Sequence, residues 1–269
     1  MKGFGSTPDM KLADSHCHLN DPAYAPDLDE VLQRAARAGV TAMMVIGTDP
    51  ASSARAVQLA SEHPACYASV GIHPHEAKLC RSKDLEGLYR LAGRPPVRAW
   101  GEIGLDFNRL HSPRQDQEKW LVKQLAAAES LDLPLILHER DSGGRLLEML
   151  LAWGDGRHRG VVHCFTGNRT ELSRYLDMGL HIGITGILTI KGRGAALREM
   201  VGCVPADRLL IETDAPYLTP TPERNRHRRN EPAFVRTVLA KLAQVRGQDA
   251  DKLAEIIWHN TCRLFRIED

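Results

Sequence analysis

Features that mark membrane, secreted and zinc-ribbon proteins are missing from this sequence of 269 residues. No apolar run approaches the roughly 18 residues that a membrane span needs, and the N-terminal segment MKGFGSTPD has no apolar signal region. The six cysteines are scattered without a C-x-x-C pair, which fits reduced thiols better than a disulfide framework or a zinc ribbon. We therefore expect a cytoplasmic protein that does not bind membranes.

An excess of charge of one sign is also missing. Thirty-five basic and 34 acidic residues give a formal net charge of +1, so no global field attracts nucleic acid, and a polyanion site must be local. The chain has no evident linker or low-complexity tract, and 43% of its residues are hydrophobic. We predict a monomer with a flexible extension at residues 1–10 and a single domain at residues 11–269.

Short apolar segments alternate with helical patterns along this domain. Eight segments rich in apolar or β-branched residues predict strands at 12–18, 41–47, 66–73, 98–106, 134–139, 160–165, 181–186 and 209–214. Helical apolar spacing follows each of the first seven, and two more helices are expected at 231–246 and 249–263. Buried strands alternating with helices indicate a (β/α)8 TIM-type barrel with extra C-terminal helices. A doubly wound open sheet is the competing arrangement.

Polar side chains stand at the carboxyl ends of these strands. In ADSHCHLN, residues 13–20, Asp14, His16 and His18 alternate, so a strand period of two predicts one common face with Asp14 a step deeper. Because residues from several strand ends converge at the catalytic rim of a barrel, we expect a site there. The same end of five other strands carries His73, Glu102, His138, His163 and Asp214.

Burying these imidazoles and carboxylates unpaired would be costly, and bound cations would relieve that cost. The candidate metal ligands outnumber those of one tetrahedral site, which indicates two divalent ions sharing a bridging carboxylate. Glu102 is the expected bridge, because no lysine occupies the fourth to sixth strands to supply a carbamylated bridge. Such ligands suit Zn²⁺, Mn²⁺, Fe²⁺ or Ni²⁺ in tight sites and Mg²⁺ where waters remain, so ligand type alone does not choose the metal. We expect Mg²⁺ or Mn²⁺, with Zn²⁺ as the alternative. We place His16, His18 and Asp214 on one ion, and His138 and His163 on the other.

A water held between two such ions would have a lowered pKa and act as a nucleophile. Asp214 would face that water as the general base, so Asp214 and Glu102 are the predicted catalytic residues. Glu212 lies two residues before Asp214 on the same face. It either orients a metal ligand or is an inward carboxylate of the barrel interior.

A basic run, RNRHRRNEP at residues 224–232, follows the eighth strand and should therefore lie beside the same rim. Arginine side chains can bind phosphates bidentately, so Arg228 and Arg229 are candidate substrate contacts. His73 and His75 of GIHPH and Arg140 of HERD are candidates for the same role. Contacts of this kind hold a strand without reading its sequence.

Taken together, the segments DSHCHL, GIHPH, GEIGLDF, LILHERD, VVHCFTG, GITG, IETDAPYL and RRNEPA resemble the TatD family of metal-dependent deoxyribonucleases, within the amidohydrolase-like barrels. The resemblance extends from residue 14 to residue 233. It implies a TIM-type barrel that hydrolyses DNA phosphodiesters with divalent metals, often as a 3′–5′ exonuclease on single strands. We predict single-stranded DNA as the substrate, with RNA as a further candidate. The family's metal residues match His16, His18, Glu102, His138, His163 and Asp214. This chain retains the first histidine pair, which some close relatives with GLDFNR and RRNEPA lack.

The residues are also compatible with two other functions. The same water could attack a carbonyl in a small-molecule amidohydrolase or a D-aminoacyl-tRNA deacylase, an activity also linked to the family. A closed apolar pocket would favour a small substrate, whereas an open basic groove would favour a polymer. A non-catalytic nucleic-acid-binding barrel would have empty metal sites and would keep binding after Glu102 is replaced.

Overall fold

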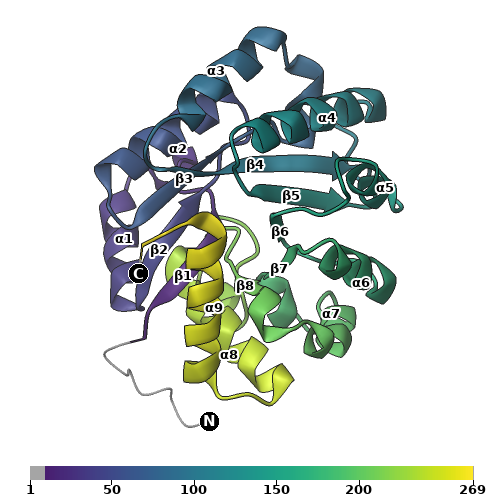
Figure 1. The fold of residues 1–269 in the computed structure, drawn as a ribbon. Helices are drawn as coiled ribbons and strands as arrows, with labels where there is room; N and C mark the ends of the chain where they lie inside the picture. Colours follow the sequence, from purple (N-terminus) through teal and green to yellow (C-terminus); the bar gives the residue numbers. More distant parts are fainter. Residues whose placement is uncertain (1–9, 269) are drawn as a thin grey trace.

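The computed structural model describes residues 10–268, so the extension predicted at residues 1–10 lies outside the described residues, apart from Met10. These residues form one parallel sheet of eight strands in the order β1 to β8. The ring closes just beyond β8, where Asp214 donates a backbone hydrogen bond to His16 and His18 donates one to Ala215. The predicted (β/α)8 barrel is confirmed (Figure 1). The strands are β1 Leu12–Cys17, β2 Val40–Val45, β3 Cys66–Val70, β4 Val97–Asp106, β5 Leu135–Arg140, β6 Gly160–Val162, β7 His181–Ile184 and β8 Leu209–Ile211.

Helices follow the strands, as the sequence predicts, and surround the barrel (Figure 1). Local signals set several of their ends: Asp49 accepts hydrogen bonds from the backbone of Ala51 and Ser52 at the start of α2, and Gly247, at φ 63°, ends α8. The helices are α1 Leu28–Arg37, α2 Pro50–Glu62, α3 Ser82–Ala92, α4 Arg114–Ser130, α5 Arg145–Leu151, α6 Arg169–Asp177, α7 Ala195–Met200, α8 Val235–Arg246 and α9 Ala250–Phe265.

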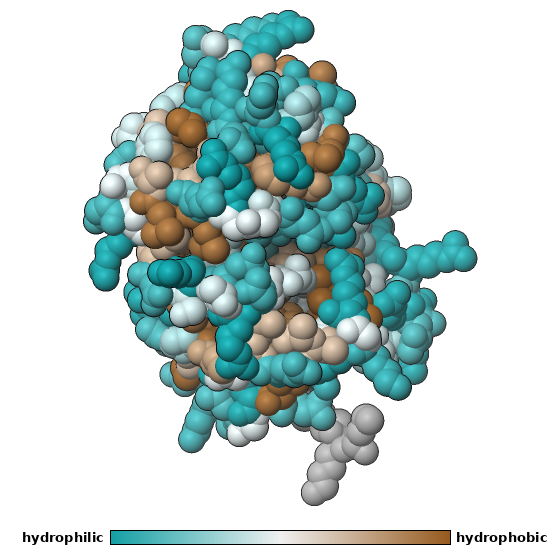
Figure 2. All heavy atoms as spheres, turned by 90° about the vertical axis from the view of Figure 1, so that its right-hand side faces the viewer, coloured by the Kyte–Doolittle hydropathy of each residue, from teal (hydrophilic) through white to brown (hydrophobic). Residues whose placement is uncertain are grey.

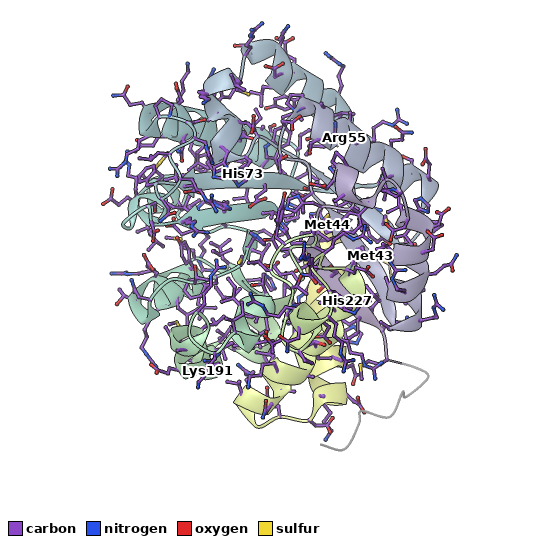
Figure 3. The ribbon with its side chains drawn as sticks, turned by 180° about the vertical axis from the view of Figure 1, so that it is seen from behind. Met43, Met44, Arg55, His73, Lys191 and His227 are labelled. Carbon is purple, nitrogen blue, oxygen red and sulfur yellow. The ribbon has the colours of Figure 1, made fainter. Side chains whose placement is uncertain are left out.

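The strands separate two apolar layers. Met43 of β2 belongs to the larger layer between strands and helices, whereas its neighbour Met44 belongs to the smaller inner layer (Figure 3). The inner layer joins alternate strand residues to Trp258 and Phe265 of α9. Asn260 of α9 also donates hydrogen bonds to the carbonyl groups of Ala206 and Leu209, at the start of β8. Helix α9 therefore closes the amino-terminal end of the barrel and leaves the carboxyl end for the site.

The predicted common face of Asp14, His16 and His18 is wrong for Asp14. The pairing of β1 with β2 shifts register between Asp14 and Cys17. Ser15 contacts Glu212, whereas Asp14 accepts hydrogen bonds from the backbone and the hydroxyl of Thr213. Because Glu212 and Thr213 are consecutive residues just beyond β8, the side chains of Ser15 and Asp14 face opposite sides of the barrel wall. The irregularity turns Asp14 into the barrel wall and still brings both histidines to the mouth.

The surface of the helices is mostly hydrophilic, with small separate apolar patches on the face formed by α4 to α7 (Figure 2). Among residues 10–268, no helix is both long enough and apolar enough to cross a bilayer.

Candidate metal centre

Glu102 lies at the centre of the barrel mouth. Its Oε1 is 2.8 Å from His138 Nδ1, 3.5 Å from His73 Nε2 and 3.9 Å from His163 Nε2. Its Oε2 is 3.4 Å from His16 Nε2. One buried carboxylate therefore touches imidazoles from β1, the ends of β3 and β6, and β5. Glu102 is the residue that the sequence predicts as the bridge between two cations.

Two glycines of GEIGLD bring β4 close enough to β5 for this arrangement. A Cβ on Gly104 would lie 2.0 Å from the carbonyl oxygen of His138, and a Cβ on Gly101 would lie 2.6 Å from that of Ile136. Both glycines also have positive φ, at 143° and 157°. Larger residues would push the strands apart and separate Glu102 from His138.

The second cluster combines the first histidine pair with Asp214. His18 Nε2 is 3.3 Å from His16 Nε2 and 3.3 Å from Asp214 Oδ1. The same Oδ1 is 3.7 Å from His16 Nε2 and 3.8 Å from His163 Nε2. Asp214 has φ 57°, a left-handed conformation that Asp tolerates better than most residues. The turn after β8 thus aims its carboxylate back at the histidines.

Glu212 contacts His163 from the other side of the ring. Its Oε1 is 2.8 Å from His163 Nδ1 and accepts a hydrogen bond from the backbone of Cys164. Gly183 leaves room for this carboxylate, since a Cβ there would lie 2.6 Å from Glu212 Oε1. Of the two roles left open by the sequence, the contact supports a carboxylate that fixes the ring of His163, a predicted metal ligand.

The clustered imidazoles and carboxylates shift one another's pKa values. Burial opposes ionisation of Glu102, but the histidines around it, His73 and His16 foremost, hold its pKa well below the usual range. Burial likewise disfavours the His163 imidazolium, yet the charge of Glu212 and its other carboxylate neighbours raise the pKa of His163 to about 10. The pKa of Asp214 is lowered despite burial, chiefly by His18. Both Glu102 and Asp214 are therefore carboxylates at neutral pH.

Three groups of side chains have ligand atoms near enough to hold a metal ion: His16, His18 and Asp214; His73, Glu102 and His138; and His16, His163 and Glu212. The first group coincides with one predicted metal. The second group contains His73, which the sequence analysis assigned to substrate binding. His163 was predicted to share a metal ion with His138, but it is grouped with His16 and Glu212 instead.

Asp106, at the end of β4, is a site residue that the sequence analysis missed. Its Oδ2 is 2.7 Å from His75 Nε2 and 3.4 Å from His138 Nε2. Asp106 lies four residues after Glu102, so the strand period of two was the signal for a second carboxylate on that face. It fixes His138 from behind, as Glu212 fixes His163.

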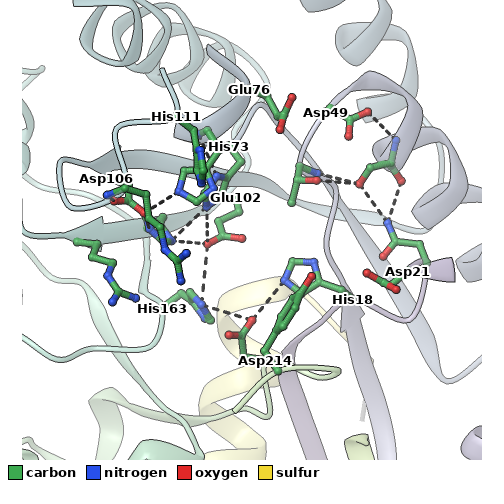
Figure 4. Close-up of a pocket in the computed structure, with 18 of the residues that line it drawn as sticks. His18, Asp21, Asp49, His73, Glu76, Glu102, Asp106, His111, His163 and Asp214 are labelled. Atoms are coloured by element: carbon green, nitrogen blue, oxygen red, sulfur yellow. Dashed lines mark hydrogen bonds and ion pairs between the residues drawn. The ribbon is translucent and has the colours of Figure 1, made fainter. Parts of the chain in front are cut away.

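The two clusters open into a cavity of about 680 Å³ at the barrel mouth (Figure 4). His73, His75 and Arg140, the residues predicted to contact substrate, line it together with His111 and Arg193, which were not predicted. Figure 3 shows His73 beside β4. Most of the residues that line it are polar or charged, unlike those of a closed apolar pocket for a small molecule.

Two neighbouring arginines of the basic run, Arg228 and Arg229, lie in different environments. Arg228 is exposed and lines a second cavity beside the mouth. Arg229 instead forms a bidentate ion pair with Asp27, at 2.7 and 2.6 Å, and lies over the ring of Tyr24. Arg229 lines neither cavity. The structure thus contradicts its predicted role in substrate binding, because its guanidinium already joins the loop after β8 to the start of α1.

We expect Arg229→Ala to lower the thermal unfolding temperature by a few degrees, since it removes both charge-assisted hydrogen bonds to Asp27. Arg228→Ala should leave the temperature unchanged. Differential scanning calorimetry of both variants tests this, with Asp27→Asn as the partner in a double-mutant cycle. Equal losses in the two arginine variants would contradict the assignment.

A parallel barrel whose mouth gathers histidines around a shared carboxylate defines a metal-dependent hydrolase of the barrel type. A family model described as TatD related DNase matches residues 13–266. The chain belongs to this family, which confirms the resemblance read from its motifs.

Named relatives support the same assignment. The 3′-5′ ssDNA/RNA exonuclease TatD of Rahnella sp. (strain Y9602) is 44% identical over 253 residues, covering 93% of this chain and 96% of the relative. The protein of the same name from Pantoea ananatis is 44% identical over 257 residues, covering 94% and 99%. The crystal structure of YjjV, a TatD homolog from Escherichia coli K12, superposes with a TM-score of 0.88 at 34% identity, covering 96% of this chain and 99% of that one.

Proposed function

We propose that this protein is a divalent-metal-dependent phosphodiesterase that removes nucleotides from the 3′ end of single-stranded DNA, and of RNA. The observation that carries the proposal is Glu102 in contact with four imidazoles at the mouth of the barrel. The names of relatives that match nearly the whole chain support the substrate and the direction. The polar, open cavity supports a polymer over a small apolar substrate.

Two metal ions fit the site, with Mg²⁺ or Mn²⁺ expected and Zn²⁺ as the alternative. His16, His18 and Asp214 would hold one, while His138 with Glu102 as the bridge would hold the other, with His73 or His163 completing it. When bound, the ions would lower the pKa of a water molecule and neutralise charge on the phosphate.

The residues of the chain supply the remaining chemistry. Asp214 is a carboxylate at neutral pH and reaches the cavity, so it can accept the proton of the attacking water at its free oxygen. Glu212 and Asp106 fix the rings of His163 and His138. Arg140 at the rim positions the phosphate chain. We place the reaction in the cytoplasm, in line with six free cysteines.

Digestion of a 5′-labelled single-stranded oligonucleotide with Mg²⁺, Mn²⁺ or chelator tests the proposal. We expect a metal-dependent ladder that shortens from the 3′ end. An oligonucleotide that stays intact with every metal would refute the proposed nuclease activity, and aminoacyl-tRNA would then be the next substrate to test.

A further inference from the structure

A second cavity, of about 480 Å³, adjoins the mouth on the side of the loops after β7 and β8. The two cavities share three lining residues, Arg193, Tyr217 and Leu218, so they form one continuous groove. We call the second cavity the side groove. It leads away from the metal centre along the exposed part of the basic run.

Cationic side chains dominate the side groove. Arg193, Arg224 and Arg228 line it together with His227, and none of its lining residues, within the described part of the chain, carries a carboxylate. No hydrogen bond or ion pair engages the guanidinium groups of Arg193, Arg224 or Arg228 among residues 10–268. Arg229, by contrast, is neutralised by Asp27. Free guanidinium groups along a groove are suited to successive phosphates.

Tyr217 stands where the side groove meets the mouth. Its side chain is 54% exposed, one of the few large rings at the surface of the described chain. The ring packs against His18 in a T-shaped arrangement, with centroids 5.8 Å apart and planes at 69°. An exposed aromatic ring beside cationic side chains is the combination that binds single-stranded nucleic acid through base stacking.

We infer that the side groove binds the part of the strand that lies 5′ of the scissile phosphate, with Arg193 and Arg228 on its phosphates and a base stacked on Tyr217. This inference rests on the proposed function and adds to it the route that the substrate strand takes across the surface. It predicts that affinity grows with strand length until the groove is filled, and that a dinucleotide, which reaches only the mouth, does not use the groove.

Fluorescence anisotropy tests the path without hydrolysis. The probes are 5′-fluorescein-labelled oligothymidylates of two and six nucleotides, titrated in EDTA. Wild type should bind the hexamer more tightly than the dimer. Arg193→Ala/Arg228→Ala should weaken hexamer binding roughly tenfold and lower its salt slope by about 1.4, the value for two phosphates of a single strand. Tyr217→Ala should weaken it roughly fivefold or more, whereas Tyr217→Phe should not.

Arg226→Ala is the matched control, because Arg226 is exposed in the same loop but does not line the side groove. If Arg226→Ala binds the hexamer as tightly as wild type does, the result supports strand binding in the side groove. Equal affinity for both lengths in wild type, or an equal loss in Arg226→Ala, would overturn it. The experiments distinguish this inference from the proposed function. If the protein digests no oligonucleotide but still binds the hexamer more tightly than the dimer, the proposed nuclease activity is wrong and the proposed binding groove stands.

Discussion

Glu102→Gln should abolish metal-dependent hydrolysis of single-stranded DNA, with a loss of about 10³-fold or more. The carboxylate touches four imidazoles. In the proposed site, its removal would take away the ligand that both metal ions share. The neutral amide keeps the shape of the side chain, and the imidazoles can release their protons, so the barrel should stay folded. Initial rates of oligonucleotide digestion and metal content after dialysis measure the effect.

Glu76→Gln is a suitable control for this variant. Glu76 lines the same cavity but is not a member of the three groups able to hold a metal. It should keep the activity and the metal content of wild type. A Glu102→Gln enzyme that kept more than a tenth of wild-type activity would refute the bridging role, and circular dichroism would separate that result from misfolding.

Asp214→Asn should lower the rate by about 10²- to 10⁴-fold, the range over which a positioned general base acts. Asn keeps an oxygen that can face His18, so the variant should hold more metal than Glu102→Gln does. The loss should therefore lie in kcat rather than in KM. Single-turnover digestion at saturating metal measures it.

Asp49→Asn serves as the matched carboxylate-to-amide change, because Asp49 lines the cavity but caps α2, and Asn caps a helix equally well. Its rate should stay within about threefold of wild type. If Asp214→Asn retained its kcat and lost only metal, Asp214 would be a ligand without a role in proton transfer.

The sequence predicted the barrel well, because strand and helix periods are local properties and each βα unit repeats them. It also predicted that Glu102 is central. It missed Asp106, although the period of β4 places that residue on the face of Glu102. It also misplaced Asp14, because the register shift in β1 depends on pairing with β2, a long-range property that no local pattern reveals.

The loops were the least predictable part of the site. Arg228 and Arg229 are adjacent and chemically identical, yet Asp27, about 200 residues away in the chain, binds only the second. No sequence spacing distinguishes them. Arg193 and Tyr217 escaped notice for the same reason, since their loops meet only after the barrel closes.

The position of helix α9 at the end of the chain affects how the protein folds during its synthesis on the ribosome. Its Trp258 and Phe265 complete the apolar layer inside the strands, whose first members come from β1 and β2. While the ribosome still holds residues 250–265, that interior is open to water at one end, and a nascent chain exposes it to chaperones and to other chains. The inner layer is therefore completed late, and shortening the chain before α9 would yield an aggregating product with every predicted metal ligand still present.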